Sequence, residues 1–207
     1  FGSGASLDGG NAYVSALKSN LDPSVALFAD MLRAPRFDAK DIDRVKAQWI
    51  AGIAQEKAQP QSVAMRVLPP LLYGDAHPYG IPFTGSGTEA AIAGLTRDDL
   101  LAYQRTWLRP ENATIVVVGD TTLAEIVPVL NRHLGDWKGA GEAVQPKPLA
   151  QVARPDKPRV YLIDQPGAVQ ANIMAGLLMP STTDPDAVKL EMSNDVLGGS
   201  FTSRLNM

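Results

Sequence analysis

The chain has 207 residues, of which 45% are hydrophobic and 20% charged, with a formal net charge of −3 and no cysteine. This is the composition of a folded globular protein with room for one large domain or two small ones. The charge gives no electrostatic basis for binding nucleic acid or an acidic membrane, and no apolar run reaches the length of a membrane span. Without cysteine, a disulfide framework, a zinc-thiolate site and a cysteine nucleophile are all excluded.

The first third of the chain predicts one strand followed by helices. Alternating polarity indicates the strand, while proline, aspartate and apolar periodicity mark the helices. The predicted elements are a strand at 11–18, a short helix from Asp22-Pro23 to Pro35, a long helix at 38–59, and an apolar helical segment at 61–72 that Pro69-Pro70 interrupts.

The long helix contains one residue that does not suit it. Ile42, Val45, Trp49 and Ile53 recur at helical spacing and form one apolar stripe, so the helix is expected to pack into a core. Gly52 lies on the flank of this stripe, where glycine costs about 1 kcal/mol relative to alanine.

The rest of the chain mixes strands and helices around a linker. Residues 138–157 are rich in glycine, proline, alanine and glutamine, which is typical of a linker between domains. The fold class predicted from this mixture is α+β with an antiparallel sheet. The other predicted elements are an ordered loop at 73–87, helices at 88–93 and 96–107, a buried strand at 112–119, a helix from Thr121 or Thr122 to Leu134, paired strands at 159–164 and 169–178, and a helix from Asp184 to about Gly199.

The motifs of the common hydrolases and nucleotide-binding proteins are missing. There is no G-x-S-x-G elbow, no P-loop and no intact G-x-G-x-x-G. The two histidines, His77 and His133, are too few for a three-histidine zinc site, and neither belongs to H-E-x-x-H or its inverted form. No catalytic residue is therefore assigned within this chain.

Three residues remain as weak candidates for a site. His77 lies in a loop beside Asp75 and Tyr79, where a histidine that fixes an irregular loop is favoured over a catalytic one. Glu56 lies one turn after Gly52, where a helix-end carboxylate is favoured over a metal ligand. Arg204 could contact an anion of a substrate, although a surface arginine is favoured.

Three stretches, in collinear order, resemble the pitrilysin/insulinase family of zinc metallopeptidases, which includes the mitochondrial processing peptidases. They are SNLDPSVALFADMLRAPRFDAKDIDRVK at 19–46, AHPYGIPFTGSGTEAAIAGLTRDDLLAYQRTWLRPENATIVVVGD at 76–120, and LGGSFTSRLNM at 197–207. The central stretch is the most specific, because its HPYG, G-T-E, P-x-N-A-T and V-V-V-G-D elements keep the intervals of that family.

The resemblance implies the pitrilysin-like α+β fold, in which an antiparallel sheet packs against helices. Residues 1–137 would be the later part of one such domain, 138–157 the linker, and 158–207 the beginning of a second, homologous domain. A start on Phe1 without methionine, and an end on SRLNM just after a glycine pair, are expected of a piece of a longer polypeptide.

The resemblance also bears on zinc. Active halves of the family carry an inverted zinc motif upstream and a third ligand, a glutamate, in the helix that corresponds to 38–59. Here the ligand position falls on Gly52, which has no side chain to bind a metal. The resemblance thus implies no metal site and no cofactor in this chain, with zinc held by a catalytic half or partner.

The function expected is that of a non-catalytic half, which walls a chamber and binds peptide while a zinc-bearing half or partner hydrolyses it. Two alternatives stay open: an active zinc endopeptidase half with ligands outside this segment, in which Glu56 replaces the missing ligand, and a purely structural subunit. Unpaired sheet edges predict self-association. The compartment is left open, with the bacterial periplasm or cell envelope as the candidate location.

Overall fold

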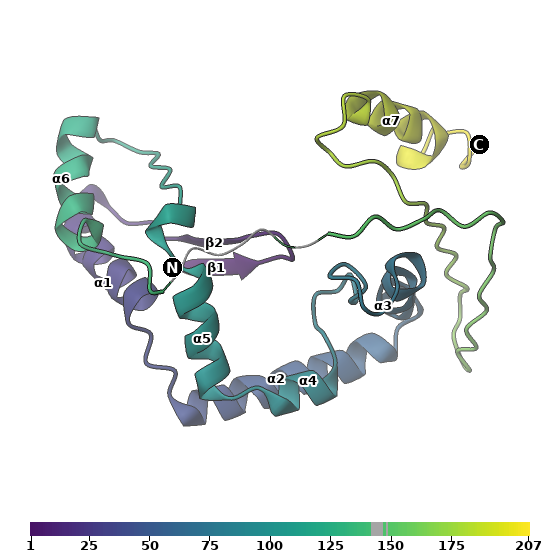
Figure 1. Ribbon diagram of the computed structural model, residues 1–207, viewed down its shortest axis with the longest axis horizontal. Coiled ribbons are helices and arrows are strands. Elements are labelled where there is room, and N and C mark those ends of the chain that lie inside the picture. Colours follow the sequence, from purple (N-terminus) through teal and green to yellow (C-terminus); the bar gives the residue numbers. More distant parts are fainter. Residues whose placement is uncertain (142–146, 148) are drawn as a thin grey trace. The chain divides into compact units, whose positions relative to one another are not determined.

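The computed structural model describes residues 1–141, 147 and 149–207 (Figure 1). Within this part of the chain, no helix is both long enough and apolar enough to cross a membrane. The elements in chain order are β1 (Gly2–Ala5), β2 (Gly10–Tyr13), η1 (Lys18–Asn20), α1 (Leu21–Arg33), α2 (Ala39–Lys57), α3 (Pro60–Tyr73), α4 (Glu89–Gly94), α5 (Arg97–Trp107), η2 (Pro110–Asn112), α6 (Leu123–Leu134), α7 (Ala187–Asn194) and η3 (Asp195–Gly199).

The chain divides into two compact units. The first contains Phe1–Ala150 together with Gln165–Asn172, and the second contains Gln151–Asp164 together with Ile173–Met207. The first unit holds β1, β2 and helices α1 to α6, whereas α7 and the turn η3 belong to the second.

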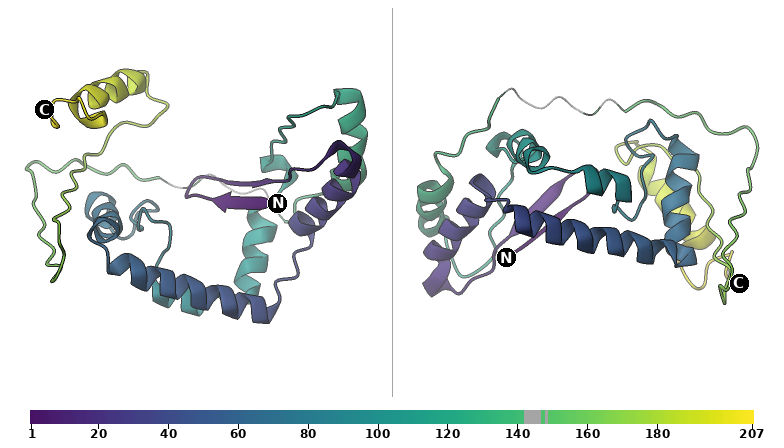
Figure 2. Two further views of the ribbon diagram at one scale, coloured as in Figure 1. Left: turned by 180° about the vertical axis from the view of Figure 1, so that it is seen from behind. Right: turned by 90° about the horizontal axis from the view of Figure 1, so that it is seen from below.

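Helices pack in two groups within the first unit (Figures 1 and 2). Helix α1 lies beside α6, and the buried side chains of Val25, Ala29 and Ile126 come from these two helices. Helix α2 lies along α4 and contacts α3, with Ile53 fully buried on its inner face. The apolar periodicity of α1, α2 and α6 therefore correctly predicted these helices. The predicted stripe of α2 is buried only at Ile53, because Val45 and Trp49 are 44% and 48% exposed.

Hydrogen-bonding side chains begin the helices where the sequence predicted. The carboxylate of Asp38 accepts a hydrogen bond from the backbone N–H of Lys40 at the start of α2. At α5, the Thr96 hydroxyl accepts from the N–H of Asp99, whose carboxylate accepts from the Thr96 N–H in return. Such capping satisfies N–H groups that have no partner within the helix.

Helix α3 differs from its prediction because it continues through Pro69 and Pro70 to Tyr73. A proline inside a helix leaves the carbonyl four residues earlier without its N–H partner, which for Pro69 is the carbonyl of Met65. The backbone N–H of Phe83 donates to that carbonyl at 2.9 Å. A loop residue thus replaces the lost donor, and the predicted interruption of the helix was wrong.

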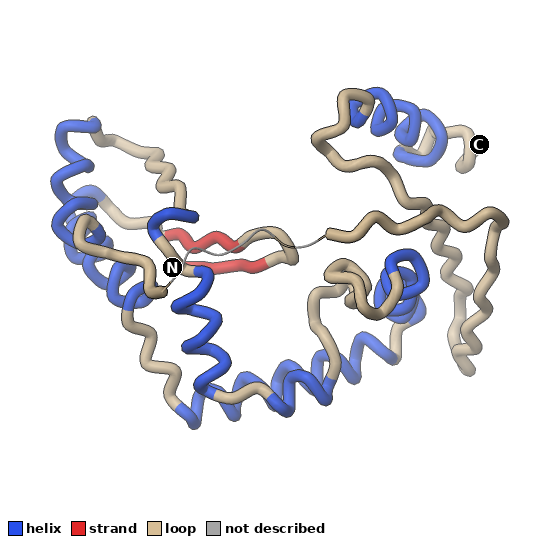
Figure 3. The backbone as a smooth tube through the Cα atoms, viewed as in Figure 1, coloured by secondary structure: helices blue, strands red, loops and turns tan. Residues whose placement is uncertain are grey.

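The strands were predicted much less well than the helices. The antiparallel hairpin of β1 and β2 pairs Gly2 with Tyr13 and Ala5 with Gly10. The predicted strand at 11–18 is therefore paired only as far as Tyr13, and its partner β1 was not predicted. Figure 3 shows this hairpin, which is the two-stranded sheet found among the described residues.

The buried strand predicted at 112–119 was wrong. Residues 113–118 join no ladder among the described residues, and the side chains from Ile115 to Val118 are exposed. A run of β-branched residues has a high strand propensity, but a strand forms only when a second segment supplies its hydrogen-bond partners.

The strands predicted at 159–164 and 169–178 are likewise unpaired within the part of the chain that the structure describes. The connection between them does form: the N–H of Ala168 donates to the carbonyl of Gln165 at 3.1 Å, across Pro166 and Gly167. Gly167 has a φ of 81°, as the third residue of a type II turn requires. The turn is thus determined locally, whereas the ladder is not.

Candidate functional site

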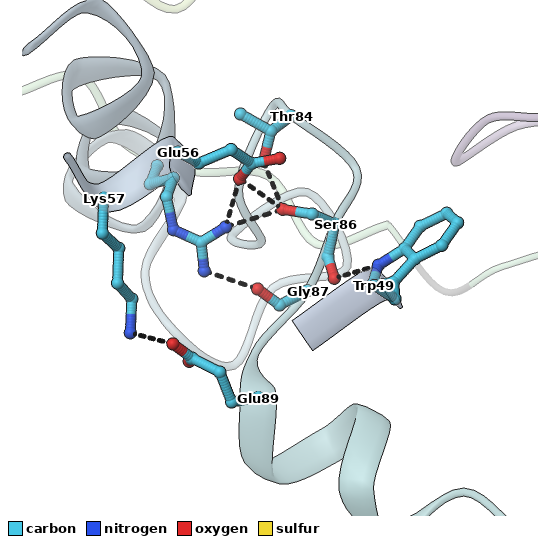
Figure 4. A network of polar contacts seen from close by, with 8 residues as sticks. Trp49, Glu56, Lys57, Thr84, Ser86, Gly87 and Glu89 are labelled. Carbon is cyan, nitrogen blue, oxygen red and sulfur yellow. Dashed lines mark hydrogen bonds and ion pairs between the residues drawn. The ribbon is translucent and has the colours of Figure 1, made fainter. Parts of the chain in front are cut away.

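The end of helix α2 carries a network of polar contacts around Glu56 (Figure 4). Arg66, which comes from α3, donates from Nη1 to Glu56 Oε2 at 2.7 Å. The hydroxyl of Ser86 donates to the same carboxylate oxygen, also at 2.7 Å. The Arg66 side chain is only 9% exposed and that of Glu56 26%, so this ion pair is largely shielded from water.

The loop before α4 is held in the same network. Arg66 donates from Nη1 to the Ser86 hydroxyl and from Nη2 to the carbonyl of Gly87, both at 2.6 Å. The indole Nε1 of Trp49 donates to the carbonyl of Ser86 at 2.9 Å. Lys57 pairs with Glu89, with 2.6 Å between Nζ and Oε1, and Figure 4 shows this pair beside the network. Helices α2 and α3 and the loop are thus joined by charged and polar side chains.

A Gly-Ser-Gly sequence explains how Ser86 reaches the network. Gly85 and Gly87 have φ angles of 71° and 70°, a left-handed conformation that residues with a Cβ rarely adopt. These two left-handed glycines flank Ser86, which is buried. Its hydroxyl lies within 2.7 Å of both Glu56 Oε2 and the hydroxyl of Thr84.

The surroundings of Glu56 favour its charged form. Burial acts to raise its pKa, because a carboxylate loses hydration when it is removed from water. Hydrogen bonds from Ser86 and Arg66, and from Thr84 beside them, outweigh burial and hold the pKa below its usual value of 4.5. Glu56 is therefore an ionised hydrogen-bond acceptor that the protein itself has already engaged.

Gly52 lies one turn before Glu56 on the exposed side of α2. A Cβ placed on Gly52 would have no atom within 4 Å, so the fold leaves room for a side chain there. The glycine is thus not required by packing. At the position where the resemblance expects a zinc-ligand glutamate, this chain presents bare backbone.

The residues around α2 do not fit a zinc ion. Among the described residues, no group of three or more His, Asp or Glu side chains is placed to hold a metal. Catalytic zinc needs three protein ligands and a water, whereas Gly52 offers no donor and Glu56 is paired with the cationic Arg66. No catalytic step through a metal can be built from these side chains.

His77 lies away from this network, in the loop that follows α3. Its Nδ1 accepts a hydrogen bond from the N–H of Tyr79 at 3.1 Å, which places its ring proton on Nε2. Nε2 is 3.1 Å from the carbonyl of Ala150, to which it donates. The ring also stacks on Tyr73, with centroids 5.1 Å apart. Both ring nitrogens are thus bonded to backbone groups of the protein.

Arg204 belongs to the second unit, whereas Glu56 and His77 belong to the first. Its side chain is exposed, while its backbone N–H donates to the carbonyl of Val196 at 3.2 Å. The neighbouring Ser203 is buried, and its hydroxyl has no hydrogen-bond partner among the described residues.

Two members of the Glu56 network, Arg66 and Ser86, were not predicted from the sequence. One signal for Arg66 was available, since it is the only charged residue in the apolar stretch 61–72. A charge in such a stretch is rarely buried without a partner. Ser86 had a weaker signal, the glycine on each side of it.

Comparison with known proteins identifies the family. Residues 94–207 match the family described as the peptidase M16 inactive domain. A protein named zinc protease PqqE, from Helicobacter pylori, is 22% identical over 93% of this chain and 43% of its own length.

Two solved structures have the same fold. A peptidase M16 inactive domain from Pseudomonas fluorescens has a TM-score of 0.70 at 25% identity, over 91% of this chain and 44% of its own. A protease from Helicobacter pylori has a TM-score of 0.75 at 20% identity, over 92% of this chain and 46% of its own. The chain therefore spans less than half the length of each of these relatives.

These findings confirm the predicted α+β fold and the resemblance to pitrilysin-type peptidases. They also agree with assignment to the half of such peptidases that lacks the catalytic centre. The family match covers more than half of the 207 residues. The chain belongs to the family of peptidase M16 inactive domains.

Proposed function

We propose that this chain is part of the non-catalytic half of a zinc peptidase, and that it walls a chamber in which peptides are bound. A zinc-bearing half or a partner subunit hydrolyses the peptide. The observation that carries the proposal is the state of helix α2: the helix is kept and packed through Ile53, while the expected ligand position is an open glycine. The name of the Helicobacter relative, a zinc protease, supports zinc in the complete enzyme.

In this function the Glu56 network has a structural task. It holds α2, α3 and the loop 84–89 together, so that the chamber wall keeps its shape while peptides enter and leave. Rigid walls favour binding because less conformational entropy is lost when the ligand docks. Catalytic chemistry is left to the zinc-bearing half.

The proposal includes the division of the chain into 1–137, the linker 138–157, and 158–207. Two observations support it. The described residues between 138 and 157 contain no helix or strand, and the first of the boundaries between the two compact units falls between Ala150 and Gln151, although Gln165–Asn172 belongs to the first unit again.

Metal analysis combined with a peptidase assay tests the proposal. The purified chain is incubated with Zn²⁺ and dialysed, its zinc content is measured, and hydrolysis of a quenched fluorescent peptide library is followed with and without a chelator. We expect less than about 0.1 zinc per chain and no chelator-sensitive hydrolysis, because catalytic zinc needs three protein ligands. One zinc per chain together with chelator-sensitive cleavage would overturn the proposal.

The variant Glu56→Gln separates this proposal from an active half in which Glu56 is a ligand. In a preparation that contains the zinc-bearing half, we expect Glu56→Gln to leave the zinc content unchanged. Loss of zinc in Glu56→Gln but not in Asp41→Asn, a carboxylate on the same helix, would support the active half instead. If a zinc-bearing partner co-purifies but cleaves peptides equally well without this chain, its role is only structural.

Self-association is a further part of the proposal. The exposed run Ile115–Val118 supports it, because an unpaired β-branched segment can form a ladder with a second copy. Sedimentation velocity of the chain should show a dimer whose fraction rises with concentration. Val116→Lys should reduce that fraction, whereas Gln48→Lys on the exposed side of α2 should not. A monomer at all concentrations would exclude it.

A further inference from the structure

The segment that leaves α6 is fastened to the first unit by a buried arginine. Arg109, which lies between α5 and η2, is only 6% exposed. It donates from Nη1 to the carbonyl of Ala140 at 2.7 Å and from Nη2 to that of Gly141 at 3.3 Å. Its Nε is also 3.4 Å from a carboxylate oxygen of Glu111, which orients the guanidinium group.

Gly139 allows this close approach. A Cβ built on Gly139 would lie 2.7 Å from three atoms of the Arg109 guanidinium, which is closer than real Cβ atoms come to other groups. The backbone at 139 thus lies directly against the guanidinium plane. A guanidinium can donate several hydrogen bonds from one plane, so a single side chain can hold two successive carbonyls.

A second fastening lies a few residues further along, at the tip of the β1–β2 hairpin. The ammonium group of Lys147 pairs with the carboxylate of Asp8 at 3.1 Å and also donates to the carbonyl of Leu7. The hydroxyl of Tyr79 donates to the same Asp8 oxygen at 2.6 Å, and the ammonium lies 5.7 Å from the centre of its ring. Lys147 therefore meets both an anion and an aromatic ring, two surroundings that favour a cation.

His77 completes this second fastening by donating from Nε2 to the carbonyl of Ala150. Its ring is held by Tyr73 and Tyr79, whose centroids lie 5.1 and 5.6 Å from it. The residue that the sequence offered as a site candidate thus contacts Ala150, within the predicted linker.

We infer that residues 139–141, 147, 149 and 150, which we call the strap, are fastened to the first unit and move with it. The flexible part of the connection to the second unit then begins at Gln151, although the sequence predicts a linker from 138 onwards. The fastening does not depend on the proposed function.

Spin labelling can test the fastening, because the chain has no cysteine of its own. One label is placed on Leu149→Cys in the strap and another on Gln61→Cys, an exposed position on α3. Pulsed electron resonance of the full chain then measures their distance distribution, with circular dichroism as a check of helix content. We expect a distance distribution with one narrow peak.

Three further variants are each expected to broaden this distribution. Lys147→Ala, at a partly buried side chain, and Asp8→Ala, at an exposed one, should raise the population outside the main peak by about three- to tenfold. Gly139→Ala should do so by pushing the guanidinium aside without removing a charge. Lys157→Ala is the matched control, another lysine of the linker that precedes a proline, and should leave the distribution unchanged.

The inference is wrong if Lys147→Ala and Asp8→Ala, with unchanged helix content, give the distribution of the parent chain. It is also wrong if Lys157→Ala broadens the distribution as much as they do. If either Lys147→Ala or Asp8→Ala loses helix content, the distance distribution of the other variant is the test. The readout needs neither zinc nor peptide, so a negative result leaves the proposed function in place, and a failure of that function leaves the fastening in place.

Discussion

Replacing Arg66 by alanine should destabilise the first unit through the loss of one buried ion pair. The guanidinium is 9% exposed and donates to Glu56, Ser86 and Gly87. Removing one partner of a buried pair costs about 3–5 kcal/mol, because the other charge stays behind without compensation. Glu56 is 26% exposed, so water partly replaces the arginine, and we expect a loss of about 2–3 kcal/mol in the free energy of unfolding.

Urea denaturation followed by circular dichroism measures this loss. With a slope of about 1–3 kcal/mol per molar urea, the transition midpoint should fall by about 0.7–3 M, without a change in slope. Arg44→Ala is the matched control, because Arg44 forms an exposed pair with Asp41 at 3.2 Å on the same helix α2. Such a pair contributes less than about 0.5 kcal/mol to stability, so the urea midpoint of Arg44→Ala should hardly change.

A double-mutant cycle identifies the source of the loss. If Arg66 acts through the carboxylate, then Arg66→Ala combined with Glu56→Ala should cost less than the sum of the two single changes by about 1–3 kcal/mol. Two results would refute the reasoning: a loss below about 0.5 kcal/mol in Arg66→Ala, or strictly additive single changes. Either would mean that the network does not hold these elements together.

Three further predictions concern pH, glycine and helix capping. Because the folded-state pKa of Glu56 lies below its usual 4.5, the stability that this carboxylate contributes is present above pH 4.5 and is lost as the pH falls through the folded value. Acid titration of the free energy of unfolding should therefore show a smaller loss in Glu56→Gln than in the parent chain, and equal losses would contradict the assignment; the remaining loss comes from other carboxylates with lowered pKa values, such as Asp8 and Asp136. Gly52→Ala should stabilise the chain by about 1 kcal/mol, since its Cβ would meet open space in a helix. Gly85→Ala should destabilise the chain by at least about 1 kcal/mol, since Gly85 has a φ of 71°. Thermal unfolding compares the two variants, and an equal effect of both on stability would contradict the assignment. Thr96→Ala should lower the free energy of unfolding by about 1 kcal/mol because it removes the cap of α5, whereas Thr96→Ser should keep most of that stability. Equal stability of the alanine and serine variants in urea denaturation would argue against the cap.

Much of the helical structure could be predicted from the sequence, because helices depend on neighbouring residues. The cap at Asp38 and the capping pair at Thr96 are local signals, and both are present in the structure. The error at Pro69 shows where local reasoning ends, since the N–H that replaces its missing donor comes from Phe83, fourteen residues away.

Strands could not be predicted to the same extent, for a physical reason. The run from Ile115 to Val118 has the side chains of a buried strand, yet it is exposed and unpaired among the described residues. Side-chain propensity favours an extended backbone, but a ladder also needs a partner at the right place in three dimensions. The turn at 165–168, which needs only four neighbouring residues, forms as its sequence indicates.

The candidate site likewise combines features that a single residue determines with features that depend on residues distant in the sequence. From the residues alone it follows that Gly52 offers no ligand and that cysteine chemistry is excluded, and the resemblance indicates the family of peptidases. The role of Glu56, in contrast, depends on the folded chain, because its partners Arg66 and Ser86 are 10 and 30 residues away along the sequence. A carboxylate at a helix end can bind a cation of any kind, and the fold supplies an arginine.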